Sequence, residues 1–261
     1  NKSLPVHSWF YCSQAFSAKL VGSLLDTLEV TQNQKVLDPF CGIGTTLLTC
    51  VQRGISSVGC DIFPPFCFVS QVKVRQGYDL PSLKSHIDNI VKAPYHKPKI
   101  AAPDHPIFKK AFSPNVLNRI LYFKEKIMEI EDEKTRDFLM LGLLSTINEV
   151  SYVRKAGAHY RFINVDNIGV RHQYGTKKFC TSNVKVVIRR KLYNMFRDLE
   201  LVNVGKGPTE AISNVYMGDA RKMTFLGNNS IDAVITSPPY LNRDNYVAQY
   251  KIELFLLGPP Y

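Results

Sequence analysis

The sequence predicts an α/β fold with a parallel sheet, interrupted by a mainly helical and basic insertion. Three observations lead to this prediction. Strand and helix signals alternate over the first hundred residues, strand signals return between residues 214 and 235, and the stretch between them carries most of the positive charge. Strands and helices that alternate at this spacing are typical of parallel sheets with right-handed crossovers.

The first part of the sheet is expected between residues 15 and 76. Apolar residues recur there at helical spacing, and short apolar runs stop at Asp38 and Asp61. Pro64 and Pro65 suit the first turn of a helix, where a missing N–H costs little. The predicted strands are 35–37 and 57–60, and the predicted helices are 15–28, 45–52 and one that begins at residue 64.

The middle and the end of the chain are interpreted in the same way. Four prolines between residues 94 and 106 predict a linker. Helices are predicted at 113–130, 133–150 and 184–199, with a loop at 157–182. Strands are predicted at 214–216 and, as a buried strand, at 231–235, before a last helix at 246–257.

The composition excludes several classes of protein. Hydrophobic residues make up 45% of the 261 residues, which is enough for a packed core. No apolar run approaches the roughly 18 residues that a membrane span needs, and no signal peptide opens the chain. The six cysteines form no C-x-x-C pair, so we expect reduced thiols, no metal site and a cytoplasmic protein.

The positive charge is concentrated in about one fifth of the chain. The net charge is +11, and residues 151–206 account for +9 of it, with 12 Lys and Arg against 3 acidic residues. A localised basic patch suits a polyanionic partner. A solvated basic face is the alternative interpretation, and charge alone does not exclude it.

A glycine turn follows the first predicted strand, within Asp38-Pro-Phe-Cys-Gly-Ile-Gly-Thr-Thr46. Gly42 and Gly44 allow a ligand to approach the backbone closely, and the following helix directs free N–H groups at it. Asp61, which ends the next strand, can accept hydrogen bonds from both ribose hydroxyls of an adenosine. The fuller G-x-G-x-x-G of dinucleotide sites is absent, which favours an adenosine ligand. An ordinary glycine turn and a surface aspartate are the alternative.

A second motif, Thr236-Ser-Pro-Pro-Tyr240, follows the last predicted strand. Two successive prolines fix the backbone and leave its carbonyl groups free and rigidly aimed. Carbonyls of Ser237 or Pro238, with the Ser237 hydroxyl, can accept hydrogen bonds from an exocyclic amino group. Tyr240 offers a flat face on which a base can stack.

Together the two motifs resemble the S-adenosylmethionine-dependent amino-methyltransferases of DNA. The first looks like the cofactor loop of that family and the second like its catalytic loop. His7-Ser-Trp-Phe-Tyr11 with Phe16 looks like the segment that closes over the methionine end of the cofactor. Gly218-Asp219 looks like the turn that meets the adenine ring. The resemblance covers residues 7–76 and 214–257.

The resemblance implies a role for each matching residue. Ser237, Pro238, Pro239 and Tyr240 would hold the flipped target base, and Asp219 would contact the adenine amino group of the cofactor. Serine in the first place of the S-P-P-Y loop is typical of enzymes that modify cytosine N4, so this base is preferred over adenine N6. The residues expected to bind S-adenosylmethionine are Tyr11, Asp38, Phe40, Gly42, Gly44, Thr45, Asp61, Ile62 and Asp219.

The basic segment is interpreted as the target-recognition region, because it lies between the two loops. Its partner would be double-stranded DNA, with Lys and Arg on phosphates and other side chains on base edges. The residues expected to bind nucleic acid are Arg154, Lys155, Arg161, Arg171, Lys177, Lys178, Arg189 and Arg190. An RNA methyltransferase acting on guanine N2 or cytosine N4, and an inactive DNA-binding component, are the alternatives.

The resemblance also implies how the chain is organised. The fold would be a Rossmann-like methyltransferase sheet, incomplete at the C-terminus because only four of the family's seven strands can be placed. Residues 1–103 would form its cofactor-binding half, 104–206 the helical and basic insertion, and 207–261 the part with the catalytic loop. A second chain or a missing segment would complete the sheet, whose open edge favours association. We expect a protein of the prokaryotic or phage cytoplasm or nucleoid, with a role in restriction-modification.

Overall fold

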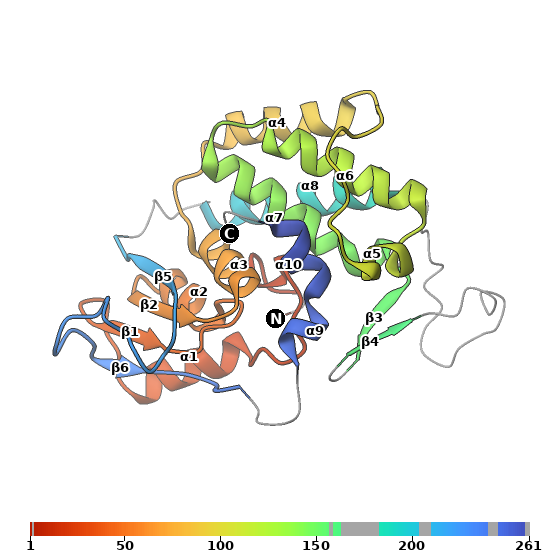
Figure 1. Ribbon diagram of the computed structural model, residues 1–261. Coiled ribbons are helices and arrows are strands. Elements are labelled where there is room, and N and C mark those ends of the chain that lie inside the picture. Colours follow the sequence, from red (N-terminus) through yellow and green to blue (C-terminus); the bar gives the residue numbers. More distant parts are fainter. Residues whose placement is uncertain (2, 157–158, 163–182, 204–209, 240–244, 259–261) are drawn as a thin grey trace. The chain divides into compact units, whose positions relative to one another are not determined.

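A computed structural model describes residues 1, 3–156, 159–162, 183–203, 210–239 and 245–258 of the chain. These residues pack into two compact units, which are considered separately (Figure 1). The first unit contains residues 1–79 and 195–240, and the second contains residues 80–194 and 241–258. Residues 80–103, which the sequence analysis placed with the cofactor-binding half, therefore pack with the helical unit.

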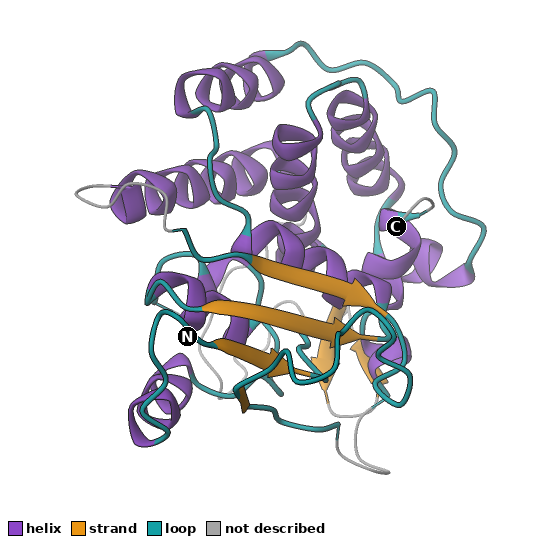
Figure 2. Cartoon of the chain, turned by 90° about the vertical axis from the view of Figure 1, so that its left-hand side faces the viewer, coloured by secondary structure: helices purple, strands orange, loops and turns teal. Residues whose placement is uncertain are grey.

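The first unit is built on a four-stranded parallel sheet in the order β5-β2-β1-β6 (Figure 2). Its strands are β1 (Lys35–Asp38), β2 (Ser56–Asp61), β5 (Ser213–Met217) and β6 (Ala233–Val234). Leu37 of β1 pairs with Val58 of β2 on one side and with Val234 of β6 on the other. This confirms the predicted parallel sheet, and its four strands are the four that the sequence indicated.

Three helices pack on this sheet and on one another: α1 (Ala18–Thr27), α2 (Thr45–Gln52) and α3 (Pro64–Val74). The Ser17 hydroxyl caps α1 by accepting a hydrogen bond from the Leu20 N–H. Two prolines occupy the first turn of α3, as predicted. A short 3-10 helix, η1 (His7–Trp9), precedes α1.

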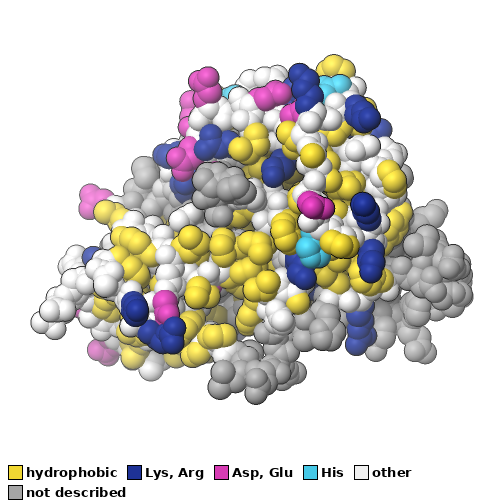
Figure 3. Space-filling view, viewed as in Figure 1, with side chains coloured by type: hydrophobic (Ala, Val, Ile, Leu, Met, Phe, Trp, Pro, Cys, Tyr) yellow, Lys and Arg dark blue, Asp and Glu magenta, His cyan; other side chains and the backbone are white. Residues whose placement is uncertain are grey.

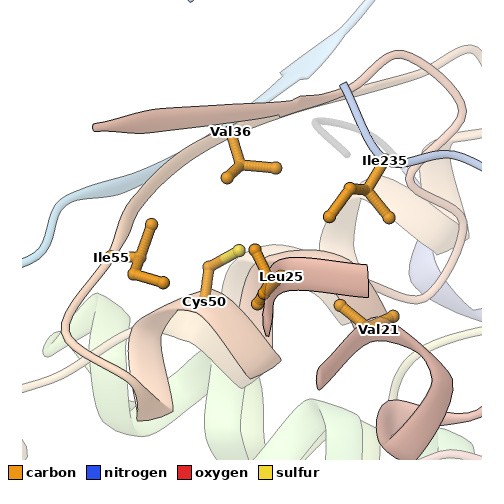
Figure 4. Packing of buried hydrophobic residues seen from close by; sticks show 6 residues of the cluster. All are labelled: Val21, Leu25, Val36, Cys50, Ile55 and Ile235. Atoms are coloured by element: carbon orange, nitrogen blue, oxygen red, sulfur yellow. The ribbon is translucent and has the colours of Figure 1, made fainter. Parts of the chain in front are cut away.

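The core of the first unit lies between α1, α2 and the sheet (Figure 4). Each buried aliphatic side chain of this size contributes about 1.5–3 kcal/mol through the hydrophobic effect. The cluster joins segments from both ends of the chain, because Ile235 packs with residues 21–55. Its buried members are Val21, Leu25, Val36, Cys50, Ile55 and Ile235.

The prediction of a buried strand at 231–235 is wrong. Strand β6 has two residues, and Val234 leaves 55% of its surface exposed. The reason is that β6 is an edge strand and side chains alternate between the faces of a sheet. Ile235 turns toward the core and is buried, whereas Val234 turns away from it.

The second unit is mainly helical. Its central helix, α7, is apolar on nearly all faces of its middle turns, as is typical of a helix that packs against other elements on all sides. The predicted helix at 246–257 is interrupted at Tyr250 and forms α9 and α10. The helices of this unit are α4 (Leu80–Lys92), α5 (Pro106–Ala111), α6 (Pro114–Met128), α7 (Glu133–Val150), α9 (Tyr246–Gln249), α10 (Lys251–Leu257) and the first part of α8 (Val184–Asn203).

Two parts of the second unit differ from the sequence analysis. Helices α4 and α5 occupy stretches for which no helix was predicted. An antiparallel hairpin, β3 (Val153–Ala156) and β4 (His159–Phe162), extends into the stretch predicted as loop. Among the helices that the structure describes, none is long and apolar enough to cross a membrane.

Candidate active site

The turns that follow the four strands of the first unit carry the predicted site residues. The glycine turn follows β1, Asp61 ends β2, Asp219 follows β5, and Thr236 to Pro239 follow β6. Because the strands are parallel, these turns lie at one edge of the sheet, the side to which the arrowheads point in Figure 2. Open α/β sheets bind their ligands at this carboxyl edge.

The carboxylate of Asp38 joins the glycine turn to the double-proline loop. It accepts hydrogen bonds from Thr46 Oγ1 at 2.6 Å and from Thr236 Oγ1 at 2.8 Å, and the Phe40 N–H donates to it at 3.2 Å. Burial raises the pKa of Asp38, and these three donors oppose that shift. The two motifs, 198 residues apart in sequence, thus share one carboxylate.

Asp38 differs in one respect from what the resemblance implied. It was expected among the residues that bind the cofactor, but only 1% of its surface is exposed. Its oxygens are turned inward onto two hydroxyl groups and a backbone amide. We therefore assign Asp38 to the joining of the two loops and not to ligand contact.

Both glycines of the turn have positive φ, +51° at Gly42 and +76° at Gly44, but their surroundings differ. A Cβ atom on Gly42 would meet nothing within 4 Å, whereas one on Gly44 would lie 2.8 Å from Ser70 Oγ. Ser70 in turn donates a hydrogen bond to the Gly42 carbonyl at 2.7 Å. Gly42 therefore faces open space where a ligand can approach, and Gly44 packs against α3.

Asp61 holds the glycine turn from the neighbouring strand. Its Oδ2 accepts from the Gly42 N–H at 2.8 Å, and its Oδ1 accepts from the Phe63 N–H at 2.9 Å. Partial burial raises the pKa of Asp61, and these amides oppose the shift. Since a carboxylate oxygen has two lone pairs, each oxygen keeps acceptor capacity for a hydroxyl donor.

Large hydrophobic side chains are exposed around this edge. Ile62 leaves 73% of its surface uncovered, and Figure 3 shows hydrophobic side chains gathered over the part of this face where Figure 1 places β2, β5 and α3. Exposed apolar clusters of this kind mark ligand grooves or interfaces. Tyr11, Phe40 and Ile62, which the sequence analysis selected, are all exposed, and Met217 joins them.

An aromatic pair supports the turn after β5. The Tyr216 ring stacks on the Phe225 ring with centroids 4.1 Å apart and planes 12° apart. The Gly218 N–H donates to the Asp61 carbonyl at 2.9 Å, which holds this turn beside the end of β2. Sequence reasoning missed this pair, although the aromatic residue two places before Gly218-Asp219 was a usable signal.

Asp219 is already engaged by a neighbour. Arg221 donates to its carboxylate from Nε at 3.0 Å and from Nη2 at 2.5 Å. These hydrogen bonds lower the pKa of Asp219 to about 2, so it is ionised at neutral pH. An amino group that approaches Asp219 would share this carboxylate with Arg221, a residue that the sequence analysis did not single out.

The buried thiols near the site fit a packing role. Cys41 and Cys60 are buried, and burial first and the Asp61 charge second raise the pKa of both. They are therefore neutral thiols and not nucleophiles. A Cβ atom on Gly59 would come within 2.6 Å of Leu47 and 2.9 Å of Cys41, so the backbone is close-packed here.

The double-proline loop continues from β6 along β1. The Ile235 N–H donates to the Leu37 carbonyl at 3.0 Å, and Thr236 is then fixed by Asp38. Ser237 is half-buried, and Pro238 and Pro239 are exposed. The fourth predicted residue of this loop, Tyr240, lies outside the described residues.

The segment before α1 is anchored on the first unit. Trp9 is buried and donates from Nε1 to Asp198 Oδ2 at 3.0 Å, and the Val6 N–H donates to the same oxygen at 3.0 Å. Lys73 Nζ donates to the His7 carbonyl at 3.3 Å. This anchoring leaves Tyr11 exposed, and its contact with a cofactor stays a prediction.

Buried His7 makes the stability of this segment sensitive to acid. Burial, and then the charge of Lys73, lower the pKa of His7 from 6.5 to about 4. Because the unfolded chain takes up this proton more readily, the free energy of unfolding should fall by about 1.4 kcal/mol per pH unit between pH 6.5 and 4. Urea titrations of the wild type and of His7→Gln across this range measure it. Equal slopes for the two proteins would contradict the prediction.

The predicted nucleic-acid residues divide into two groups. Arg161 and Arg189 are exposed, and Arg190 is exposed and paired with Glu149. Arg154 instead donates to the carbonyls of Asn148 and Val153, and Lys155 forms an internal ion pair with Glu253. Arg154 Nη1 and Lys155 Nζ already have partners inside the second unit, so we do not include these two residues among the proposed phosphate contacts. Outside the described residues lie Arg171, Lys177 and Lys178.

An open hollow of about 690 Å³ lies at the other edge of the sheet. It is lined by the residues that precede β1 and β2, among them Gln32, Arg53 and Gly54. Its lining includes neither a carboxylate nor an aromatic ring. We therefore place the candidate site at the carboxyl edge, where the motif residues are.

A glycine turn, an acid at the end of the next strand and a double-proline loop thus lie at one edge of a parallel sheet, the arrangement that the resemblance to the amino-methyltransferases implied. Sequence comparison confirms the resemblance, because the chain is a relative of the Type II DNA methyltransferases over nearly its whole length. Methyltransferases of this type use S-adenosylmethionine as methyl donor and act in restriction-modification.

Three relatives illustrate this similarity. The chain is 28% identical to Type II methyltransferase M.BsoBI of Geobacillus stearothermophilus, over 99% of its own residues and 54% of the relative. It is 27% identical to M.AvaI of Anabaena variabilis, over 99% and 55%. It is 25% identical to M.MvaI of Kocuria varians, over 85% and 50%. The chain thus spans about half the length of these relatives. No family model and no solved structure matches it.

Proposed function

We propose that this chain carries the catalytic site of an enzyme that transfers a methyl group from S-adenosylmethionine to an exocyclic amino group in double-stranded DNA. One observation carries the proposal. The Asp38 carboxylate accepts hydrogen bonds from both loops, so the glycine turn and the double-proline loop are held together at the carboxyl edge of the sheet. A cofactor and a base bound at these loops would be neighbours.

The proposed cofactor site lies along the ends of β1, β2 and β5. Gly42 would let the methionine part of the cofactor approach the backbone, because nothing occupies the space beside its Cα. The free acceptor positions of Asp61 suit the two ribose hydroxyls, and the exposed side chain of Ile62 suits one face of the adenine. Asp219 would accept from the adenine amino group. The exposed side chains of Phe40 and Tyr11 complete the proposed set, together with the backbone of Gly44 and of Thr45 at the start of α2, since the Thr45 side chain is buried.

The proposed chemistry asks mainly for orientation. The cofactor supplies a methyl group that its sulfonium already activates. The chain has to hold the amino nitrogen of the base in line with that methyl group, and such positioning can account for most of the rate enhancement. Carbonyl groups fixed by Pro238 and Pro239, together with the Ser237 hydroxyl, would accept hydrogen bonds from the amino group. A base within a duplex must leave the stack to reach them, at a cost of a few kcal/mol.

Cytosine N4 is the preferred acceptor, and adenine N6 is the alternative. The preference depends on Ser237, since serine at the head of this loop is typical of the enzymes that modify cytosine. A serine hydroxyl is a neutral donor and acceptor, whereas the aspartate more common in adenine enzymes only accepts when it is ionised.

Nucleoside mass spectrometry tests the proposal. The complete chain is incubated with duplex DNA, or with tRNA, and with S-adenosylmethionine that carries a trideuterated methyl group. We expect labelled N4-methylcytosine from DNA. Labelled N6-methyladenine would reassign the base, and label in tRNA alone would favour the RNA alternative. Cofactor binding without any transfer, or no binding at all, would contradict the proposed activity of this chain.

DNA binding should depend on Arg161 at the end of the β3–β4 hairpin. Arg161→Ala is expected to weaken binding of duplex DNA uniformly across sequences and to reduce the slope of log K against log salt by about 1. The charge is exposed and so available to a phosphate. Fluorescence anisotropy at several salt concentrations measures it. Lys134→Ala, at the opposite end of α7 from the hairpin, is the control and should leave the slope unchanged.

A further inference from the structure

The residue Lys155, expected from the sequence to bind DNA, forms an almost fully enclosed ion pair. Its Nζ lies 2.5 Å from Glu253 Oε1, and the side chains are only 10% and 1% exposed. The same Nζ lies 3.5 Å from the centroid of the Tyr250 ring, a cation–π contact. This charge is enclosed within the second unit and does not face solvent.

The ion pair belongs to a network that joins the hairpin to α10. Tyr160 pairs with Lys155 across the hairpin, so their side chains share one face of it. The Tyr160 hydroxyl donates to Glu253 Oε2 at 3.4 Å and accepts from the Ile252 N–H at 3.4 Å. Burial, with Glu253 beside it, raises the pKa of Tyr160 and keeps its hydroxyl protonated.

The position of this network in the chain suggests its purpose. Glu253 and Tyr250 follow the double-proline loop closely in sequence, since the loop motif ends at Tyr240 and α9 begins at Tyr246. On the other side, the hairpin that carries Lys155 and Tyr160 also carries the exposed Arg161. Tyr250 interrupts the helix, which lets its ring cover the Lys155 ammonium.

We propose that Lys155, Glu253 and Tyr160 are positioning residues that couple the DNA-contacting hairpin to the segment following the catalytic loop. This inference rests on the proposed function. A buried ion pair is seldom the most stable solution for a core, and a well-packed apolar pair of similar volume often replaces it without loss. A pair that fixes one geometry between two elements gives a reason to keep the charges, because they fit only one register of hairpin against helix.

The test separates geometry from stability by comparing single and double replacements. Lys155→Met and Glu253→Gln each leave one buried partner without its counterpart, and both should lower the melting temperature. Lys155→Met combined with Glu253→Leu removes both charges and should recover most of the melting temperature. Its single-turnover rate of methyl transfer to DNA should still fall about 10- to 100-fold, since small misplacements of reacting groups have effects of this size.

Three controls make the result specific. The dissociation constant for S-adenosylmethionine should stay within about twofold of wild type in the double variant, because the proposed cofactor residues belong to the first unit. Lys155→Arg keeps the charge and should retain more of the single-turnover rate than Lys155→Met does. Glu125→Gln alters another carboxylate of the second unit, one that accepts from the Lys99 and Ile100 amides, and should change stability without changing the rate.

The outcomes distinguish this inference from the proposed function. A double variant that recovers both its melting temperature and a wild-type single-turnover rate would show that the network serves stability alone. This would overturn the positioning role while methylation by the wild type stands. Absence of methyl transfer by the wild type would overturn the proposed function and this inference with it.

Discussion

Replacing Gly44 by alanine is expected to lower the free energy of unfolding by about 2–4 kcal/mol and to abolish cofactor binding. Two physical costs add up. A residue with a side chain pays roughly 1–2 kcal/mol to hold a left-handed backbone such as the +76° at Gly44. Its Cβ would also lie 2.8 Å from Ser70 Oγ and 3.1 Å from the Ser70 Cα, so α3 must move. Chemical denaturation and calorimetric titration with S-adenosylmethionine measure the two effects.

Gly42→Ala is the matched control, since it lies in the same turn with a φ of +51°. Its Cβ would meet no atom within 4 Å, so we expect only the conformational cost of about 1–2 kcal/mol. The added methyl group nevertheless projects into the space assigned to the cofactor and should weaken cofactor binding at least about tenfold. Equal losses of stability in the two variants would contradict the packing described for Gly44, and unchanged affinity in Gly42→Ala would move the cofactor elsewhere.

Replacing Thr236 by valine should lower the rate of methyl transfer by about 100-fold while costing only about 1.5–3 kcal/mol of stability. Valine keeps the shape of threonine and removes only the hydroxyl that donates to Asp38 at 2.8 Å. The double-proline loop then loses its link to the glycine turn, so the base and the cofactor are no longer held in line. Single-turnover kinetics with saturating cofactor isolates this step.

The control for Thr236→Val is Thr46→Val. Thr46 donates to the other oxygen of the same carboxylate at 2.6 Å, but removing its hydroxyl leaves the Phe40 N–H and the Thr236 hydroxyl on Asp38, so the link to the double-proline loop remains. Both variants should lose similar stability, and only Thr236→Val should lose most of its rate. If both lose rate equally, Asp38 acts on the glycine turn alone and the two loops are not coupled through it.

The elements of the first unit could be predicted because local signals there agree with the fold. The apolar runs that become β1 and β2 stop at Asp38 and Asp61, and Pro64-Pro65 marks the start of α3. Proline and glycine act within one turn of the chain, so a sequence pattern reports them directly. The parallel arrangement follows from the alternation of strand and helix.

The contacts that decide individual roles could not be predicted, because they join distant parts of the chain. A lysine in a basic stretch suggests a phosphate contact, yet Lys155 is paired with Glu253, 98 residues further on. Asp38 stands in the cofactor motif, yet its carboxylate faces Thr236. The apolar run that ends at Ile235 suggests a buried strand, yet only Ile235 is buried and its neighbour Val234 in β6 is exposed at the edge of the sheet. Burial of this kind depends on partners that no local pattern records.

The strand order has a consequence for the time at which the site can form. Strands β1 and β2 are complete by residue 61, but both of their outer neighbours come from residues 213–234. A ribosome adds about 5–20 residues per second, so the two central strands, β1 and β2, wait on the order of ten seconds for their outer neighbours β5 and β6. Parallel pairings between such distant segments form slowly. The outer edges of β1 and β2 therefore cannot both be paired until synthesis has passed residue 234 of the 261 residues.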